Sequence, residues 1–336
     1  MRFSIKHLLP LLLVVIALLA LSVSAVSAQD DDDELTFAMV SHGGVGNPFW
    51  IVVIKGMEDA CALLDANCQW LSDPVDDVNA MAGFCDDALA LNPDGIGVTS
   101  PNPDVIRDCL ETADSQGIPI VIFNTADPNA GTDQALPAMF YIGASEFAGG
   151  RSNAQRILQE AAADGVEIGG VVCPIQEVGH SGLEARCAGV ESVMDENGVP
   201  VQRLTITNDV TASAGTIQDF FAANSEYNAI TMLGPNPSSS FNLAAQEMGM
   251  GGRGEEGYIY ATTHDTSQEI YEMIQSGRLL QAIDQQPYLQ GFESIMWLYL
   301  NSQFELAPGG DIFTGPGVID QSNVDAVIEL TAGGYR

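Results

Sequence analysis

The stretch Leu35-Thr36-Phe37-Ala38-Met39-Val40 is followed, after a glycine-rich loop, by Asn47-Pro48-Phe49-Trp50. The first six residues form a short apolar run that is typical of a buried strand. Pro48 suits the first position of a helix, where its missing N–H costs nothing, and Asn47 is a good N-cap. The stretch therefore predicts a strand that leads into a helix, which is the unit from which α/β folds are built.

Phe49 and Trp50 are two aromatic rings at the start of a helix that is already apolar over residues 51–54. In α/β folds, the turn from strand to helix opens a crevice where ligands bind. The rings are expected either to pack in the core or to form a platform for a flat ligand. The spacing alone leaves both interpretations open.

The alternation of strand-like and helical patterns continues along the chain. Further strands are expected at 68–71, 95–98, 118–123, 139–142, 169–173, 201–207, 230–233, 258–262 and 279–283. Strands separated by helices predict parallel sheets built from βαβ units. The series, about ten units, is too long for one doubly wound domain, so we expect an α/β fold with two similar lobes.

The N-terminus has the pattern of a secretory signal. Two basic residues precede an apolar run at 8–21, and Val26-Ser27-Ala28 offers small residues for cleavage after Ala28. Residues 1–28 are the predicted signal peptide, and 29–34 form an acidic tail; an uncleaved membrane anchor is the alternative. We expect an exported protein, in the periplasm, at the outer face of the cytoplasmic membrane or outside the cell.

The chain is strongly acidic: its 336 residues include 45 Asp or Glu and only 11 Lys or Arg, for a net charge of −34. Contacts from basic residues to phosphates dominate affinity for nucleic acids. Nucleic acid is therefore excluded as a partner. An anionic small ligand would need one of the few Arg at its site.

The cysteines all follow the predicted signal. They are Cys61, Cys68, Cys85, Cys109, Cys173 and Cys187. An even number in an exported chain suggests disulfides. Pairing of neighbours (Cys61–Cys68, Cys85–Cys109 and Cys173–Cys187) is preferred among the possible connectivities. Zinc is the rival interpretation, but the sequence has no CxxC motif.

Polar loops follow the predicted strands. They are rich in Asn, Gln, Asp, Ser, Thr and His and nearly free of Lys and Arg. Ligands of parallel sheets bind outside the carboxyl ends of the strands. Two rings with many amide and carboxylate groups suit a neutral polyol, whose CH faces stack on aromatic rings and whose hydroxyls pair with fixed donors and acceptors.

A set of motifs in a fixed order resembles the periplasmic sugar-binding proteins of the ribose/galactose type, which are solute receptors of ABC importers. The motifs are Asn47-Pro48-Phe49-Trp50, Phe123-Asn124, Asp265, Asp284-Gln285-Gln286-Pro287-Tyr288-Leu289-Gln290-Gly291 and Thr314-Gly315-Pro316-Gly317. The resemblance extends over essentially the whole chain after the signal. It implies the type I periplasmic binding protein fold, in which two Rossmann-like lobes, joined by a three-stranded hinge, close around a sugar.

The resemblance also implies how the chain divides between the lobes. Residues 35–143 and about 285–310 would form the N-terminal lobe. Residues 144–284 and about 311–336 would form the C-terminal lobe. The ligand would lie in the cleft between them.

Residue roles follow from the resemblance position by position. The expected ligand-binding residues are Asn47, Phe49, Trp50, Asn124, Asp265, Gln285, His180, Glu184 and His42. Phe49 and Trp50 would flank the sugar ring, while Asn124, Asp265 and Gln285 would bind hydroxyls. His180 and Glu184 fall where ribose receptors have an Arg, Thr125 replaces a second Arg and Gly234 replaces an Asn. Ribose is thus not implied, and other pentoses, hexoses, polyols and cyclitols stay open.

These features predict a receptor that captures a neutral sugar or polyol and delivers it to the permease of an ABC importer. We expect it to act as a monomer and to need no cofactor. A sensor module that signals to a membrane partner is one alternative. A secreted hydrolase is the other, although Gly179-His180-Ser181-Gly182 only approximates a nucleophile elbow. Three histidines follow strands and could bind zinc, but the family implies no metal. We expect no enzyme activity.

Overall fold

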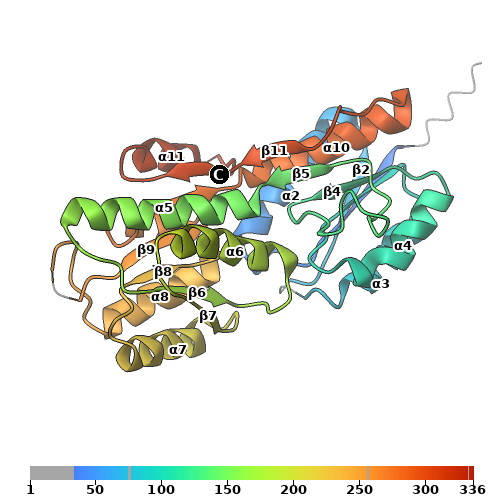
Figure 1. The fold of residues 1–336 in the computed structure, drawn as a ribbon. Coiled ribbons are helices and arrows are strands. Elements are labelled where there is room, and N and C mark those ends of the chain that lie inside the picture. The colour runs from blue at the N-terminus through green and yellow to red at the C-terminus, as the bar shows by residue number, and fades with distance from the viewer. Residues whose placement is uncertain (1–33, 75–76, 256, 332) are drawn as a thin grey trace, which may run out of the picture. The chain divides into compact units, whose positions relative to one another are not determined.

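Two six-stranded sheets, each flanked by helices, make up the part of the chain that the structure describes (Figure 1). The computed structural model describes residues 34–74, 77–255, 257–331 and 333–336, and residues 35–336 form one compact unit. The predicted signal peptide and residues 29–33 of the acidic tail lie outside the described residues. Among the described helices, none is long and apolar enough to cross a membrane.

The first sheet is parallel throughout, in the order β11-β5-β4-β3-β1-β2. Its strands are β1 (Thr36–Val40), β2 (Asn67–Leu71), β3 (Gly95–Val98), β4 (Ile120–Phe123), β5 (Tyr141–Ala144) and β11 (Ile312–Gly315). The second sheet has the order β12-β10-β9-β8-β6-β7. Its strands are β6 (Val171–Ile175), β7 (Val201–Thr205), β8 (Ala229–Thr231), β9 (Tyr260–His264), β10 (Gln281–Asp284) and β12 (Gly317–Ile319), the last antiparallel to β10.

The two sheets have the same strand order when β1 to β5 are matched with β6 to β10. The chain passes from one sheet to the other after β5, after β10 and between β11 and β12. This arrangement confirms the expected α/β fold with two Rossmann-like sheets. It also makes β4 and β9 equivalent strands, which matters for the site.

Helices cover both faces of each sheet. They are α2 (Pro48–Leu64), α3 (Met81–Ala90), α4 (Pro103–Ser115), α5 (Glu146–Asp164), α6 (Ser181–Glu196), α7 (Val210–Ala223), α8 (Pro235–Glu247), α9 (Gln268–Gln275), α10 (Pro287–Phe304) and α11 (Val324–Thr331). In the first sheet, α2 and α10 pack on one face and α3 and α4 on the other. In the second, α5 and α6 lie opposite α7, α8, α9 and α11.

Strand β1 illustrates how the sequence builds these layers. Side chains alternate between the two faces of a strand, so Phe37 and Met39 pack in the cluster with α2 and α10, whereas Ala38 and Val40 pack with α3 and α4. All four are fully buried. A strand covered on both faces therefore reads as a continuous apolar run.

The cysteines form the three neighbouring pairs preferred from the sequence. The pairs are Cys61–Cys68, Cys85–Cys109 and Cys173–Cys187. Each ties a helix to a neighbouring element: α2 to β2, α3 to α4, and β6 to α6. No zinc site is built from these cysteines, because their sulfur atoms are bonded to one another.

Strand β11 departs from the expected division of the chain. Residues from 311 onward were assigned to the C-terminal lobe, but Ile312–Gly315 pairs with β5 in the first sheet, and only β12 joins the second. The last crossing thus falls near Pro316. The sequence did not reveal β11 and β12, because strands this short give little periodic signal. The remainder of the expected lobe division stays a prediction.

Candidate functional site

One cavity gathers the expected ligand-binding residues, with the exception of Glu184. They are His42, Asn47, Phe49, Trp50, Asn124, His180, Asp265 and Gln285. These residues follow the carboxyl ends of strands in both sheets, which is where ligands of α/β sheets bind. The cavity, including its opening to solvent, has about 460 Å³ of empty space. The geometry therefore brings together residues far apart in the sequence.

Phe49 and Trp50 belong to the core and to the cavity wall at once. They are 6 % and 2 % exposed, and their rings meet edge to face with centroids 4.9 Å apart. Asn47 caps α2 by accepting the N–H of Phe49 at 3.2 Å. The core-packing interpretation is confirmed, and both residues also line the cavity. Their role as a platform for a ligand stays a prediction.

Asn124 and Asp265 occupy equivalent places, directly after β4 and β9. Both have left-handed backbones, with φ of 62° and 66°, a conformation that Asn and Asp adopt more readily than other residues with side chains. The side chain of Asn124 donates to Gln290 Oε1 at 3.3 Å. Asp265 Oδ1 accepts a hydrogen bond from Gln285 Nε2. The matching strands thus present an amide in one sheet and a carboxyl in the other.

Arg186 also lines the cavity, although the loops that follow the strands are nearly free of Lys and Arg. It lies in the second turn of α6, on the face that also carries Leu183 and is continuous with His180. Residues three apart share a helix face, so this spacing is the signal that could have found it. Inspection of the loops alone missed it because Arg186 lies inside the helix.

The guanidinium of Arg186 is committed to protein acceptors. Its Nε and Nη2 donate to Glu146, with Nη2 3.1 Å from Oε1, and its Nη1 donates to the carbonyl of Leu233 at 2.5 Å. Nη1 also lies 3.5 Å from Asp265 Oδ2. Arg186 therefore neutralises buried carboxylates and directs most of its N–H groups to protein acceptors.

Burial shifts the ionisation of this group of charges. Burial raises the pKa of Asp265 to about 6, with Arg186 and Gln285 opposing the shift. Burial by itself would lower the pKa of Arg186, but Glu146 and Asp265 hold that pKa above its usual range. Asp265 is thus an ionised acceptor at neutral pH and becomes protonated in mild acid.

His42 and His180 contact each other across the cavity, with their Nε2 atoms 3.1 Å apart. His180 Nδ1 caps α6 by accepting the N–H groups of Gly182 and Leu183, at 3.1 and 3.4 Å. Since an acceptor nitrogen carries no proton, the proton of neutral His180 is on Nε2 and is donated to His42. The Nδ1–H of His42 then donates to Thr99 Oγ1 at 2.9 Å.

Burial keeps this histidine pair neutral. It lowers the pKa of His180 to about 3, with Arg186 adding to the shift. It also lowers the pKa of His42 well below the usual value, and the neighbouring His180 and Arg186 add to the effect. The pair is therefore a neutral, directional hydrogen-bonded contact between the two sides of the cavity.

His42, Glu177 and His180 are close enough to hold a metal ion, with one possible ligand atom from each within 4.8 Å of the others. Coordination through both Nε2 atoms would move the proton of His180 to Nδ1. There it would face the N–H groups of Gly182 and Leu183. The helix cap thus favours the hydrogen-bonded pair over a metal site.

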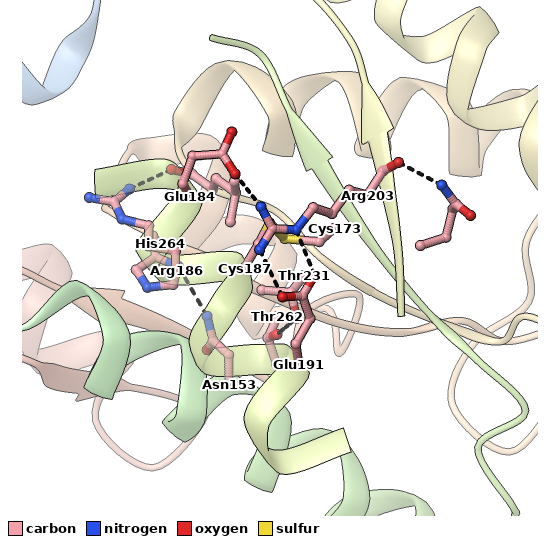
Figure 2. Close-up of a disulfide and its surroundings, with 12 residues drawn as sticks. Asn153, Cys173, Glu184, Arg186, Cys187, Glu191, Arg203, Thr231, Thr262 and His264 are labelled. Atoms are coloured by element: carbon pink, nitrogen blue, oxygen red, sulfur yellow. Dashed lines mark hydrogen bonds and ion pairs between the residues drawn. A yellow bond between two sulfur atoms is a disulfide. The ribbon is translucent and has the colours of Figure 1, made fainter. Parts of the chain in front are cut away.

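Two residues singled out from the sequence point away from the cavity. Glu184 lies on another face of α6, where it accepts from Gly179 N at 3.3 Å and pairs with Arg203 (Figure 2). His264 immediately precedes Asp265, so it points to the opposite side of the strand end. It is fully buried and meets Asn153 of α5, with His264 Nδ1 3.2 Å from Asn153 Nδ2 (Figure 2).

Two buried oxygen atoms of residues that line the cavity have no hydrogen-bond partner among the described residues. They are Gln285 Oε1 and Gln176 Oε1. Gln176 was not singled out from the sequence, although it follows β6 and so obeys the strand-end rule. A buried acceptor without a partner costs about 1–3 kcal/mol. A ligand or an ordered water that donates hydrogen bonds to these oxygens would remove this cost.

Known proteins resemble this chain in sequence. Residues 37–305 match a family described as periplasmic binding protein domain. The chain is 28 % identical, over 284 residues, to the xylose/arabinose-binding protein XylF of Sulfolobus acidocaldarius, covering 83 % of this chain and 69 % of that protein.

Solved structures are similar over most of their length. A carbohydrate transporter from Acidothermus cellulolyticus 11B in complex with myo-inositol has a TM-score of 0.78 at 28 % identity, over 90 % of this chain and all of that one. An ABC transporter solute-binding protein from Agrobacterium vitis bound with α-D-tagatopyranose has a TM-score of 0.77 at 23 % identity, over 88 % and 98 % of the two chains.

Proposed function

The chain belongs to the periplasmic binding protein domain family, and from that premise we propose that it captures a neutral sugar or polyol and delivers it to the permease of an ABC importer. Proteins of this family are binding proteins, and the similar proteins named above bind pentoses, a ketohexose or inositol. The proposal places this chain outside the cytoplasm, acting as a monomer.

The observation that carries the proposal is the row of acceptors in the cavity. Asp265 is ionised at neutral pH, and Gln176 Oε1 and Gln285 Oε1 are buried without a partner among the described residues. Such a wall matches hydroxyl groups, which donate as well as accept. An anion would meet Asp265 while finding Arg186 already bonded to Glu146 and Leu233.

The arrangement at Ser181 speaks against the hydrolase alternative. Ser181 Oγ donates to the carbonyl of Ser100 at 3.2 Å. The neighbouring His180 uses Nδ1 to accept backbone N–H groups and Nε2 to contact His42. A nucleophilic serine needs a base within hydrogen-bond reach, and His180 has both of its nitrogens engaged elsewhere.

A thermal-shift screen across neutral pentoses, hexoses and cyclitols tests the proposal. A sugar present at a hundredfold excess over its Kd should stabilise the folded protein by about 2.7 kcal/mol. The proposal fails if no neutral sugar or polyol at millimolar concentration raises the melting temperature.

Replacing one carboxyl tests the position of the site. Asp265→Asn keeps the shape of the side chain and removes a charged acceptor, so it should weaken the binding of any sugar found in the screen by more than about tenfold. Asp104→Asn, at an exposed position in the first turn of α4, is the matched control and should leave affinity unchanged. Calorimetric titration gives both affinities; equal values in the two variants would mean that the ligand binds elsewhere.

A further inference from the structure

Gly234 forms part of the cavity wall, at the start of α8. A Cβ atom built on this glycine would lie 3.5 Å from Asp265 Oδ2 and 3.9 Å from Gln176 Nε2. Chain neighbours aside, these are the heavy atoms of described residues that would come within 4 Å. A side chain at position 234 would therefore project into the cavity, between two polar groups that line it.

Neither the backbone nor close packing requires a glycine here. Gly234 has φ 168° and ψ −176°, an extended conformation that any residue adopts. By contrast, a Cβ at Gly56 of α2 would come within 2.1 Å of a backbone oxygen, which explains that glycine by packing. The consequence of the glycine at 234 is the open space that it leaves in the cavity.

The groups around this space fit a hydroxyl. Asp265 Oδ2 is an acceptor whose contact with Arg186 is long, at 3.5 Å. Gln176 offers an Nε2 donor on the side of the space, and its Oε1 is buried without a partner in the described part of the chain. A hydroxyl can donate to the carboxylate and accept from the amide, whereas an apolar branch would do neither.

We propose that the space over Gly234 is a subsite for the exocyclic hydroxymethyl group of a hexose. Its carbon lies against Gly234 at van der Waals distance, where a side chain would obstruct it, and its hydroxyl reaches Asp265 and Gln176. The cavity then prefers a hexose to the pentose with the same ring stereochemistry. This assignment rests on the proposed function, because it names the class of sugar for the same cavity.

Sugars that differ only in this group provide the test. D-glucose is compared with D-xylose, and D-galactose with L-arabinose, by calorimetric titration. In at least one pair, the wild-type protein should bind the hexose at least about tenfold more tightly, a typical worth for a group that fits its pocket. Gly234→Ala should weaken that hexose by about tenfold or more and change the pentose by less than about threefold.

Two further variants keep the result interpretable. Gly234→Ser adds a hydroxyl that can bond Gln176 in place of the sugar, so it should also select against the hexose. Gly252→Ala is the matched control, because Gly252 is exposed and a Cβ there meets nothing within 4 Å. It should leave all affinities unchanged, and the melting temperatures of the variants without sugar should match the wild-type value.

Specific results would overturn the assignment. These are a wild-type preference for the pentose in both pairs, binding of cyclitols alone, equal losses for hexose and pentose in Gly234→Ala, or no loss at all. In each of these cases the proposed sugar-binding function stands and the subsite does not. If no neutral sugar or polyol binds the wild-type protein, the proposed function fails as well, so the two failures can be distinguished.

Discussion

Asp265 and His180, both on the cavity wall, respond to acid in opposite directions. The pKa of Asp265 rises from 3.8 to about 6 in the folded protein, so its contribution to stability is present at low pH and is lost as the pH rises through 6. The pKa of His180 falls from 6.5 to about 3. The unfolded chain then binds a proton that the folded chain does not, and stability is lost as the pH falls below 6.5.

The variant His180→Asn isolates the histidine contribution. Asn is also an N-cap residue, so α6 keeps an acceptor at its start while the titration disappears. Between about pH 6 and 4, the free energy of unfolding of the wild-type protein should fall more steeply than that of the variant, by up to about 1.4 kcal/mol per pH unit. Urea unfolding at several pH values measures both slopes, and parallel profiles would contradict the assignment of a buried neutral histidine.

Helix α6 contributes two residues to the cavity lining that were not predicted from the sequence. Its cap, His180, and two residues on one face, Leu183 and Arg186, line the cavity. The adjacent Cys187 is fully buried and bonded to Cys173 of β6, which fastens the helix to the second sheet (Figure 2). The disulfide thus anchors α6 at the residue next to Arg186.

Removal of this disulfide should affect binding as well as stability. The double variant Cys173→Ala/Cys187→Ala opens a loop with a sequence separation of 14 and should lower the free energy of unfolding by about 3 kcal/mol. It should also weaken sugar binding, because α6 loses an anchor. Cys85→Ala/Cys109→Ala is the matched control on α3 and α4, which contribute no residue to the cavity lining. Chemical denaturation and calorimetric titration separate the effects; equal losses of affinity in both variants would refute a special role for α6.

The same helix marks where sequence reasoning succeeds and where it stops. Apolar runs were sufficient to predict β1 and the turn into α2, because these signals are local. Asn124 and Asp265 were singled out through the resemblance to a family, and both follow strands. Arg186 was missed and Glu184 was misplaced because the rotation of α6 about its axis depends on packing against β6 and α5. Strand β11 was missed because four residues beside a glycine and a proline carry almost no periodicity.

At the scale of the whole molecule, the cavity is crossed by contacts between the two halves of the fold. Ser181 N at the start of α6 donates to the carbonyl of Pro101 at 3.0 Å, and His180 meets His42. The chain crosses between the sheets at three places, all on the side of β5, β10 and the β11–β12 link. Opening of the cavity would break the contacts at α6 while the three crossings act as a hinge.

A sugar should therefore favour the closed arrangement by binding both sides of the cavity. A sugar can stabilise the closed state only by the difference between its affinities for the closed and open states. We expect Asn124 and Asp265 to reach the sugar together only when the cavity is closed. Small-angle X-ray scattering should give a smaller radius of gyration for the wild-type protein with saturating sugar than without it. At a sugar concentration near the wild-type Kd, a loss of more than about tenfold in affinity leaves the sites of Asp265→Asn mostly empty, so this variant should keep the larger value there. Identical scattering curves for the wild-type protein with and without a sugar that demonstrably binds would show that the two halves do not move.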